Sequence, residues 1–280
     1  MTPTSNLLHF LAASAEEFGV KVLHPESEIA AILMALGFAA AGERAAVGTS
    51  GGGFCLMTEG MSLAGMAELP VVIVLGQRPG PSTGLPTYTS QADLDFARAA
   101  GQGEFTRLVV APGTTEEAYF WSASALNLSW RYQIPAVVLV DKTLCEGTFS
   151  FNLPAAGAAR EEETPGGGGD GYRRYLDTES GVSPLAFPPD PGAAIKINSY
   201  EHDESGFTTE LPETTIRMQR KRLRKGAALA AELERSPSVT VRGDASSKTA
   251  VLSWGSNAGV CAEAAEALGK IGRASCRERV

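Results

Sequence analysis

The segment 48–89 constrains the fold of this chain more than any other part of the sequence. Its three consecutive glycines, at 51–53, follow a short apolar stretch, and the apolar stretch after them, 54–69, is long enough for about four helical turns. An unbroken β-branched run, 70–75 (PVVIVL), comes next and is typical of a parallel strand covered on both faces. Ligands of open α/β sheets bind at the carboxyl ends of strands. The segment therefore predicts a glycine loop and a second loop at one ligand-facing edge.

Other periodic segments alternate between helices and strands. Leucine and isoleucine recur at helical spacing in 5–18, with Ser5 as a candidate N-cap, and in 28–41. Further helices are expected at 91–99, 114–130, 213–235 and 258–268, and strands at 20–23, 44–47, 107–111, 136–140 and 249–254. The alternation predicts an α/β fold with a doubly wound parallel sheet.

We expect four parts in the chain. Residues 1–151 form the first α/β domain, and residues 152–235, which begin rich in Ala, Gly, Pro and Glu, form a linker and connecting segment. Residues 236–270 start a second α/β domain that is cut off. The last ten residues, 271–280 (IGRASCRERV), look like the translated read-through of a sequencing-library adapter, so we expect a non-native tail there.

The composition excludes several kinds of partner. A chain of 280 residues with 44% hydrophobic content can bury a full core. A net charge of -8 with one basic cluster, 217–225, argues against nucleic acid and against an anionic membrane surface. No apolar stretch reaches a membrane-spanning length and the chain starts without a charged or apolar leader, so a cytoplasmic protein is expected.

Two patterns imitate metal sites. The sequence Gly169-Asp170-Gly171, followed by Asn198, mimics a signature that holds magnesium and diphosphate, but neither a buried strand before it nor a helix after it is expected. The acidic run 201–204 (EHDE) lacks ligand spacing and is read as a turn or interface segment. The four cysteines show no C-x-x-C spacing. No metal or iron-sulfur cluster is therefore assigned to this chain.

A long stretch of the sequence carries a family resemblance. The motif TSGGGFCLMTEGMSLAGMAELPVVIVLGQRPGPSTGLPT, followed by QADL and GEF, resembles the α subunit of 2-oxoacid:acceptor (ferredoxin) oxidoreductases, the family of 2-oxoglutarate and pyruvate ferredoxin oxidoreductases. The resemblance runs from MTPTS, similar to the family's Tyr-Pro-x-Thr-Pro-Ser loop, through SYEHDESGFTTE to SWGSN. The sequence departs from the family pattern at Gln102, where the family often has His. It also lacks the first Tyr-Pro of the N-terminal loop, and from this we expect the native protein to extend upstream of Met1.

The resemblance implies a fold and a catalytic residue. The implied fold is the pyrimidine-binding domain of thiamine diphosphate enzymes, followed by the start of a transketolase C-terminal-like domain. Glu28 matches the family's carboxylate, which contacts N1′ of the cofactor's pyrimidine and favours its imino form. From spacing alone, Glu28 reads as a solvated acid that interacts with the helix dipole. The resemblance favours the catalytic role.

The resemblance also implies binding residues. Arg78 and Thr87 flank the stiff loop PGPSTGLP and are expected, with Thr2, to bind the 2-oxo acid and coenzyme A, because a guanidinium can hold a carboxylate bidentately. An exposed arginine on a surface turn is the alternative for Arg78. Three further residues are expected to line the cofactor: Ser50, Gly51 and Gly52. The alternative is that they only form a tight strand-to-helix turn, and both interpretations can be true together.

The implied activity is oxidative decarboxylation of a 2-oxo acid, similar to 2-oxoglutarate, to acyl-CoA with electrons passed to ferredoxin. A β subunit would share the thiamine diphosphate and would hold Mg²⁺ and the iron-sulfur cluster, so the chain is expected to be active only with this partner. Two alternatives remain open. One is another thiamine diphosphate dehydrogenase or transketolase-like subunit, against which TGLPT and TPTS argue. The other is a non-catalytic α/β binding or assembly module.

Overall fold

The structure is a computed structural model that describes residues 2–152, 162–164, 166–235, 239–242, 248–268 and 273–277. Its centre is a four-stranded sheet of order β1-β2-β4-β3 in which all paired strands are parallel. The strands are β1 (Ala46–Ser50), β2 (Val71–Gln77), β3 (Leu108–Val110) and β4 (Pro135–Asp141). Every residue of β3 and β4 is buried, as the apolar runs predict.

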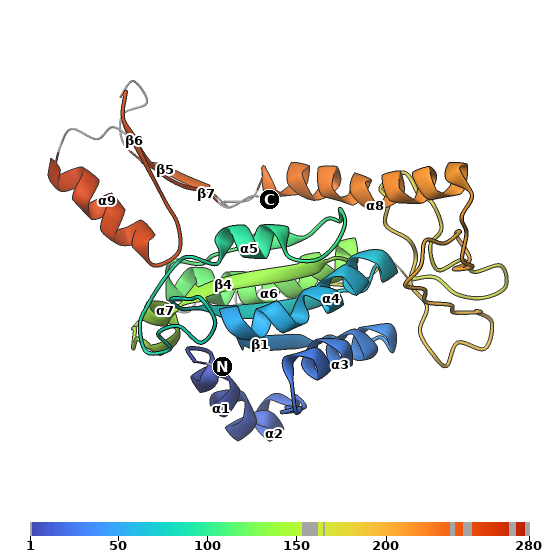
Figure 1. Cartoon of the computed structure of the whole chain (residues 1–280), viewed down its shortest axis with the longest axis horizontal. Coiled ribbons are helices and arrows are strands. Elements are labelled where there is room, and N and C mark those ends of the chain that lie inside the picture. Colours follow the sequence, from blue (N-terminus) through green and yellow to red (C-terminus); the bar gives the residue numbers. More distant parts are fainter. Residues whose placement is uncertain are drawn as a thin grey trace.

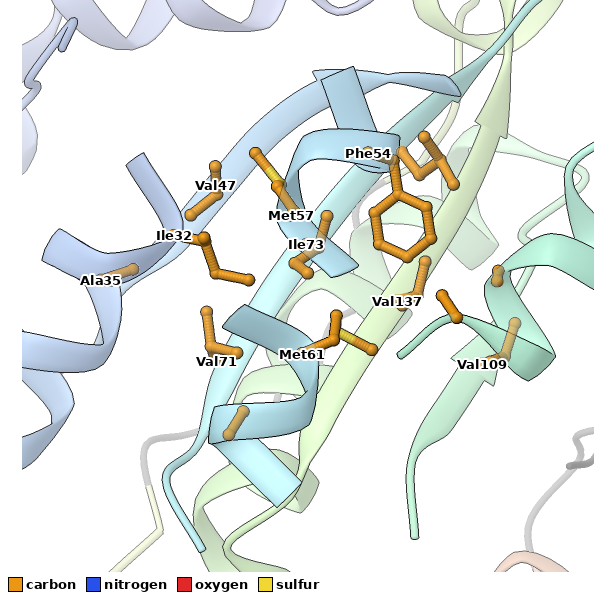
Figure 2. Packing of buried hydrophobic residues seen from close by; sticks show 14 of the residues in the cluster. Ile32, Ala35, Val47, Phe54, Met57, Met61, Val71, Ile73, Val109 and Val137 are labelled. Carbon is orange, nitrogen blue, oxygen red and sulfur yellow. The ribbon is translucent and has the colours of Figure 1, made fainter. Parts of the chain in front are cut away.

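Helices cover both faces of this sheet (Figure 1). On one face, α3 (Glu28–Ala40), α4 (Gly51–Ala67) and α5 (Leu94–Ala99) enclose a core with Phe54, Met57 and Ile73 near its centre (Figure 2). On the other face, α6 (Thr115–Tyr132) and α8 (Pro212–Leu233) pack through Trp121 and Leu229. The expected doubly wound parallel α/β sheet is confirmed.

The N-terminal region differs from the expectation. The helix expected at 5–18 is interrupted at Ser14, giving α1 (Ser5–Ala13) and α2 (Ala15–Phe18), and Thr4 holds the N-cap position expected for Ser5. The strand expected at 20–23 is wrong, since these residues have no regular structure. A strand is stabilised by hydrogen bonds to a neighbouring strand. Residues 20–23 pair with no strand in the described part of the chain, and Val20 and Leu23 are exposed.

The three glycines at 51–53 also differ from the expectation. They do not form a loop before the helix, because α4 already begins at Gly51, with Ser50 as its N-cap residue. None of the three has a positive φ. These glycines therefore leave space for neighbouring groups, and none of them is needed for an unusual backbone conformation.

Helix α7 (Lys142–Glu146) directly follows β4. The C-terminal part adds a second sheet, of order β5-β7-β6, and helix α9 (Asn257–Leu268). The strands of this sheet are β5 (Val239–Arg242), β6 (Ala250–Ser253) and β7 (Arg273–Arg277). Strand β7 lies within the segment set apart above as a non-native tail and pairs with both β5 and β6. The foreign origin expected for that segment stays a prediction.

The connecting segment returns to the first sheet through α8. Part of the expected linker, 153–161 and 165, lies outside the described residues. One side of α8 is exposed as expected, but its buried side carries charges: the Lys221 ammonium donates to Glu68 at 2.7 and 2.9 Å, and Lys225 pairs with the same carboxylate. Arg174 donates to the Glu68 carbonyl at 2.7 Å. None of the described helices is long and apolar enough to cross a bilayer.

This ionic cluster brings three cationic side chains to a single carboxylate. Burial would raise the pKa of Glu68, but Lys225, Lys221 and Arg174 outweigh that effect and hold it well below its usual range. Burial lowers the pKa of Lys225 to about 7, since one carboxylate cannot compensate for all the neighbouring positive charge. The cluster ties the end of α4 to α8, since Glu68 and Lys221 are 153 residues apart in the sequence.

Candidate functional site

The carboxyl ends of β1, β2 and β4 lie at one edge of the sheet. Ser50 is in register with Gly76, and Gln77 with Asp141. The loops that follow these strands therefore start side by side, as the sequence predicts. This edge is the candidate site.

Each glycine at the start of α4 admits a different neighbour. A Cβ on Gly53 would overlap the Thr49 hydroxyl and would lie 2.7 Å from Oε1 of Glu28. A Cβ on Gly52 would lie 3.4 Å from the Ser82 carbonyl oxygen, and one on Gly51 would lie 3.0 Å from Oδ1 of Asp93. The first turn of α4 is thus the point on which a carboxylate of α3, the loop after β2 and the start of α5 converge.

Glu28 reaches this point from the first turn of α3. The helix begins at Glu28 because Ser27 caps it, accepting a hydrogen bond from the Ala30 N–H at 3.4 Å. The Glu28 side chain is half-buried and lies against Gly53 and Thr49, beside the N-terminus of α4. A carboxylate in that place is available to a ligand at the strand ends.

Arg78 and Thr2 are brought together at the same edge. Arg78 directly follows β2 and its Nη1 donates to the backbone carbonyl of Thr2 at 3.0 Å. The N-terminal loop is held in place by Thr4, whose hydroxyl donates to the Thr49 carbonyl at 3.3 Å, and Gly76 admits the Thr4 methyl group. The contact between Arg78 and Thr2 uses the backbone carbonyl of Thr2 and not its side chain.

The other expected site residues are more widely spread. Ser50 is buried at the end of β1, directly before Gly51 and Gly52. Thr87 is exposed, and its side chain makes no hydrogen bond to any other described residue. The structure thus gathers Glu28, Ser50 and the glycines at the first turn of α4, while Thr87 lies in an exposed loop.

Sequence reasoning missed a polar network beside the site. Gln91 donates to Asp141 Oδ2 at 3.1 Å and to the Trp254 carbonyl at 2.9 Å, and the Ser256 hydroxyl donates to Asp141 at 2.6 Å. The network connects the loop after β2, the end of β4 and the turn between β6 and α9. The available signal was Asp141, an acid that ends a run of buried apolar residues and so must find a partner.

Asp93 was missed as well. It belongs to the motif QADL, which served above only as part of the family resemblance. Burial raises the pKa of its carboxyl group, although the backbone N–H and the guanidinium of Arg78 oppose that rise. Asp93 is therefore an acidic neighbour of Arg78.

The acidic run 201–204 is held inside the protein. Glu201 accepts two hydrogen bonds of 2.8 Å from Arg222, and Asp203 accepts from backbone N–H groups of its own turn. The His202 ring stacks on Tyr175 with 3.8 Å between centroids, and burial lowers the pKa of His202. Within the described residues, no group of three or more His, Cys, Asp or Glu side chains is placed to hold a metal ion.

The fold is an α/β domain with a carboxylate, Glu28, and an arginine, Arg78, at the carboxyl ends of parallel strands. The family model described as "Pyruvate flavodoxin/ferredoxin oxidoreductase, thiamine diP-bdg" matches residues 1–221, and the chain belongs to this family. The family resemblance in the sequence is confirmed.

Relatives and a solved structure agree with this membership. The chain is 42% identical over 259 residues to the 2-oxoacid:ferredoxin oxidoreductase subunit alpha of Saccharolobus solfataricus, an alignment that covers 89% of this chain and 40% of the relative. It is 36% identical over 187 residues to the 2-oxoglutarate synthase subunit KorA of Archaeoglobus fulgidus, covering 65% of this chain and 54% of the relative. The chain thus spans about half or less of the curated relatives it matches.

The solved structure is 2-oxoglutarate:ferredoxin oxidoreductase from Magnetococcus marinus with 2-oxoglutarate, coenzyme A and succinyl-CoA bound. It superposes with a TM-score of 0.86 at 31% identity, covering 98% of this chain and 48% of that chain. The described fold is therefore the one adopted by about half of that enzyme's chain.

Proposed function

We propose that this chain is part of the α subunit of a thiamine diphosphate-dependent 2-oxoacid:ferredoxin oxidoreductase. The reaction is the oxidative decarboxylation of a 2-oxo acid, of the 2-oxoglutarate kind, to acyl-CoA with electrons passed to ferredoxin. Family membership supports the proposal, as do the names of the relatives and the ligands of the Magnetococcus marinus enzyme.

One observation carries the proposal: Glu28 lies against Gly53 and Thr49 at the first turn of α4. A side chain at position 53 would displace the carboxylate, so the space next to Glu28 is kept by a residue without one. Glu28 can exchange a proton with a basic ring nitrogen placed at the strand ends, which is the contact that an aminopyrimidine requires. The residues present therefore fit thiamine diphosphate, which when bound supplies a nucleophilic carbon and an electron sink for decarboxylation.

Arg78 and Thr2 form the substrate side of the proposed site. The Arg78 guanidinium has a planar arrangement of donors that suits the carboxylate of a 2-oxo acid. Its present hydrogen bond to the Thr2 carbonyl ties it to the N-terminal loop. Thr87, in the exposed loop that follows, would contact coenzyme A or the substrate when that loop is covered.

A partner subunit is part of the proposal. Helices α1 and α3 lie along one side of the molecule (Figure 1). Both helices expose several large apolar side chains. These are Leu7, Phe10, Ile29, Leu33, Met34 and Phe38, each 36% exposed or more. Exposed apolar groups in such number mark an interaction surface. We assign this surface to the β subunit, which would hold Mg²⁺ and the iron-sulfur cluster and pass electrons to ferredoxin.

Reconstitution tests the proposal. The chain would be co-expressed with a β subunit of the same family and assayed with 2-oxoglutarate, coenzyme A, thiamine diphosphate and ferredoxin. We expect ferredoxin reduction that requires both the 2-oxo acid and coenzyme A. A purified complex that binds thiamine diphosphate but reduces no acceptor with any 2-oxo acid would refute the proposed reaction.

A further inference from the structure

Asp93 stands at a helix N-cap position without capping the helix. It directly precedes α5, where an aspartate ordinarily accepts a hydrogen bond from the backbone N–H groups of the first turn. Its side chain makes no such bond. The Asp93 N–H instead donates to the Gln77 side chain at 3.4 Å, which fixes the residue beside the end of β2. The carboxylate is thus directed toward the candidate site and away from its own helix.

The position of this carboxylate is closely determined. Its two oxygens lie 3.0 and 3.1 Å from the place that a Cβ on Gly51 would occupy, so the first residue of α4 must be small for Asp93 to fit. Oδ2 is buried and has no hydrogen-bond partner in the described part of the chain. A buried carboxylate oxygen without a donor costs free energy, and native proteins retain such groups mainly where function uses them.

Arg78 has a buried donor without an acceptor among the described residues. Its Nη1 donates to the Thr2 carbonyl at 3.0 Å, whereas its Nε is buried and has no acceptor among the described residues. Asp93 is held at the same strand end, because its N–H donates to the side chain of Gln77, the residue directly before Arg78. The charge of Arg78 also opposes the rise in the pKa of the Asp93 carboxyl, although the described residues show no ion pair between the two side chains. A buried donor and a buried carboxylate oxygen, each without a partner among the described residues, therefore lie at one end of β2.

Building on the proposed function, we propose that Asp93 is the positioning residue for Arg78. Its carboxylate accepts the Nε hydrogen of Arg78 when the two Nη groups turn to the carboxylate of the bound 2-oxo acid. The pairing satisfies both buried groups and fixes the plane of the guanidinium. Asp93 itself touches neither the substrate nor the cofactor.

The test is a double-mutant cycle in the reconstituted complex, with Asp93→Asn and Arg78→Lys made singly and together. Asparagine keeps the size of aspartate but removes the negative charge that Nε would meet. Asp93→Asn should raise the KM for the 2-oxo acid at least roughly tenfold, the scale of one charge-assisted hydrogen bond, with kcat and the KM for coenzyme A changed about twofold or less. In the Arg78→Lys background, which has no Nε donor in that place, Asp93→Asn should add little.

Asp95→Asn is the matched control, because Asp95 lies two residues further on with its side chain 94% exposed and, among the described residues, forms an ion pair only with Arg98 of the same helix. It should leave every constant unchanged. An unchanged KM in Asp93→Asn, or an equal rise in both backgrounds, would overturn the positioning role. Loss of thiamine diphosphate binding, measured by calorimetry, would do the same, since it would show a structural role. If the wild-type complex oxidises no 2-oxo acid, the proposed function fails and the role of Asp93 fails with it.

Discussion

Replacing Gly53 by alanine should move Glu28, and the size of the effect follows from the packing around α4. The new Cβ would overlap the buried Thr49 hydroxyl and lie 2.7 Å from Glu28 Oε1, closer than real Cβ contacts come. Overpacking of this kind lowers the unfolding free energy by about 1–3 kcal/mol, whereas alanine in place of a helical glycine raises it by roughly 0.5–1 kcal/mol. The net loss of unfolding free energy should be about 1–2 kcal/mol.

The functional loss should be larger than the loss of stability. A displacement of about 1 Å at a reacting group can lower the rate by roughly 10²-fold. Gly37→Ala is the control, because Gly37 lies in α3 with nothing within 4 Å of its Cβ position. That variant should gain about 0.5–1 kcal/mol in urea unfolding and serves as the control for stability alone. The reasoning is refuted if Gly53→Ala is as stable as Gly37→Ala and as active as the wild type.

Three further predictions follow from the same geometry. Arg78→Lys removes the planar fork and should raise the 2-oxo acid KM at least roughly tenfold while thiamine diphosphate still binds; a wild-type KM would place Arg78 outside the site. Burial lowers the pKa of Lys225 from 10.5 to about 7, so between these values the unfolded state holds more protons and unfolding free energy should rise with pH, by ~1.4 kcal/mol per pH unit at most. Lys225→Met should flatten that rise in urea titrations at pH 7 to 9.5, and an unchanged slope would contradict the assignment. The purified chain alone should show no iron-sulfur absorbance and no 2-oxo acid oxidation, and either signal would refute the dependence on a β subunit.

The sequence predicted the sheet because its signals are local. Runs such as 70–75 and 136–140 are short and rich in β-branched residues, which is typical of parallel strands covered on both faces, and longer segments of helical length separate them. The strand expected at 20–23 failed because a strand also needs a neighbour in space. The glycines at 51–53 were read as a loop because composition does not distinguish glycine used for a turn from glycine used for close approach.

The site could be predicted only in part. Glu28 and Arg78 were found through the family resemblance, while their surroundings depend on contacts between residues far apart in sequence. Lys221 reads as a solvated charge on α8, and only the fold shows that Glu68, 153 residues away, is its partner. Asp93 falls inside the helix expected at 91–99, and only the structure shows that it precedes α5 and that Oδ2 of its carboxylate is buried beside Gly51 without a partner among the described residues.

Proton exchange at C2 of thiamine diphosphate bound to the reconstituted complex tests the account most directly. Glu28→Gln keeps the shape of the side chain and one hydrogen-bonding oxygen but cannot exchange a proton with the pyrimidine. The account predicts that this variant folds and binds thiamine diphosphate normally, while the exchange rate, followed by NMR in deuterated solvent, falls by about 10²- to 10⁴-fold. An exchange rate equal to that of the wild type would contradict the assignment of Glu28 and move the role to another carboxylate, Glu26 first.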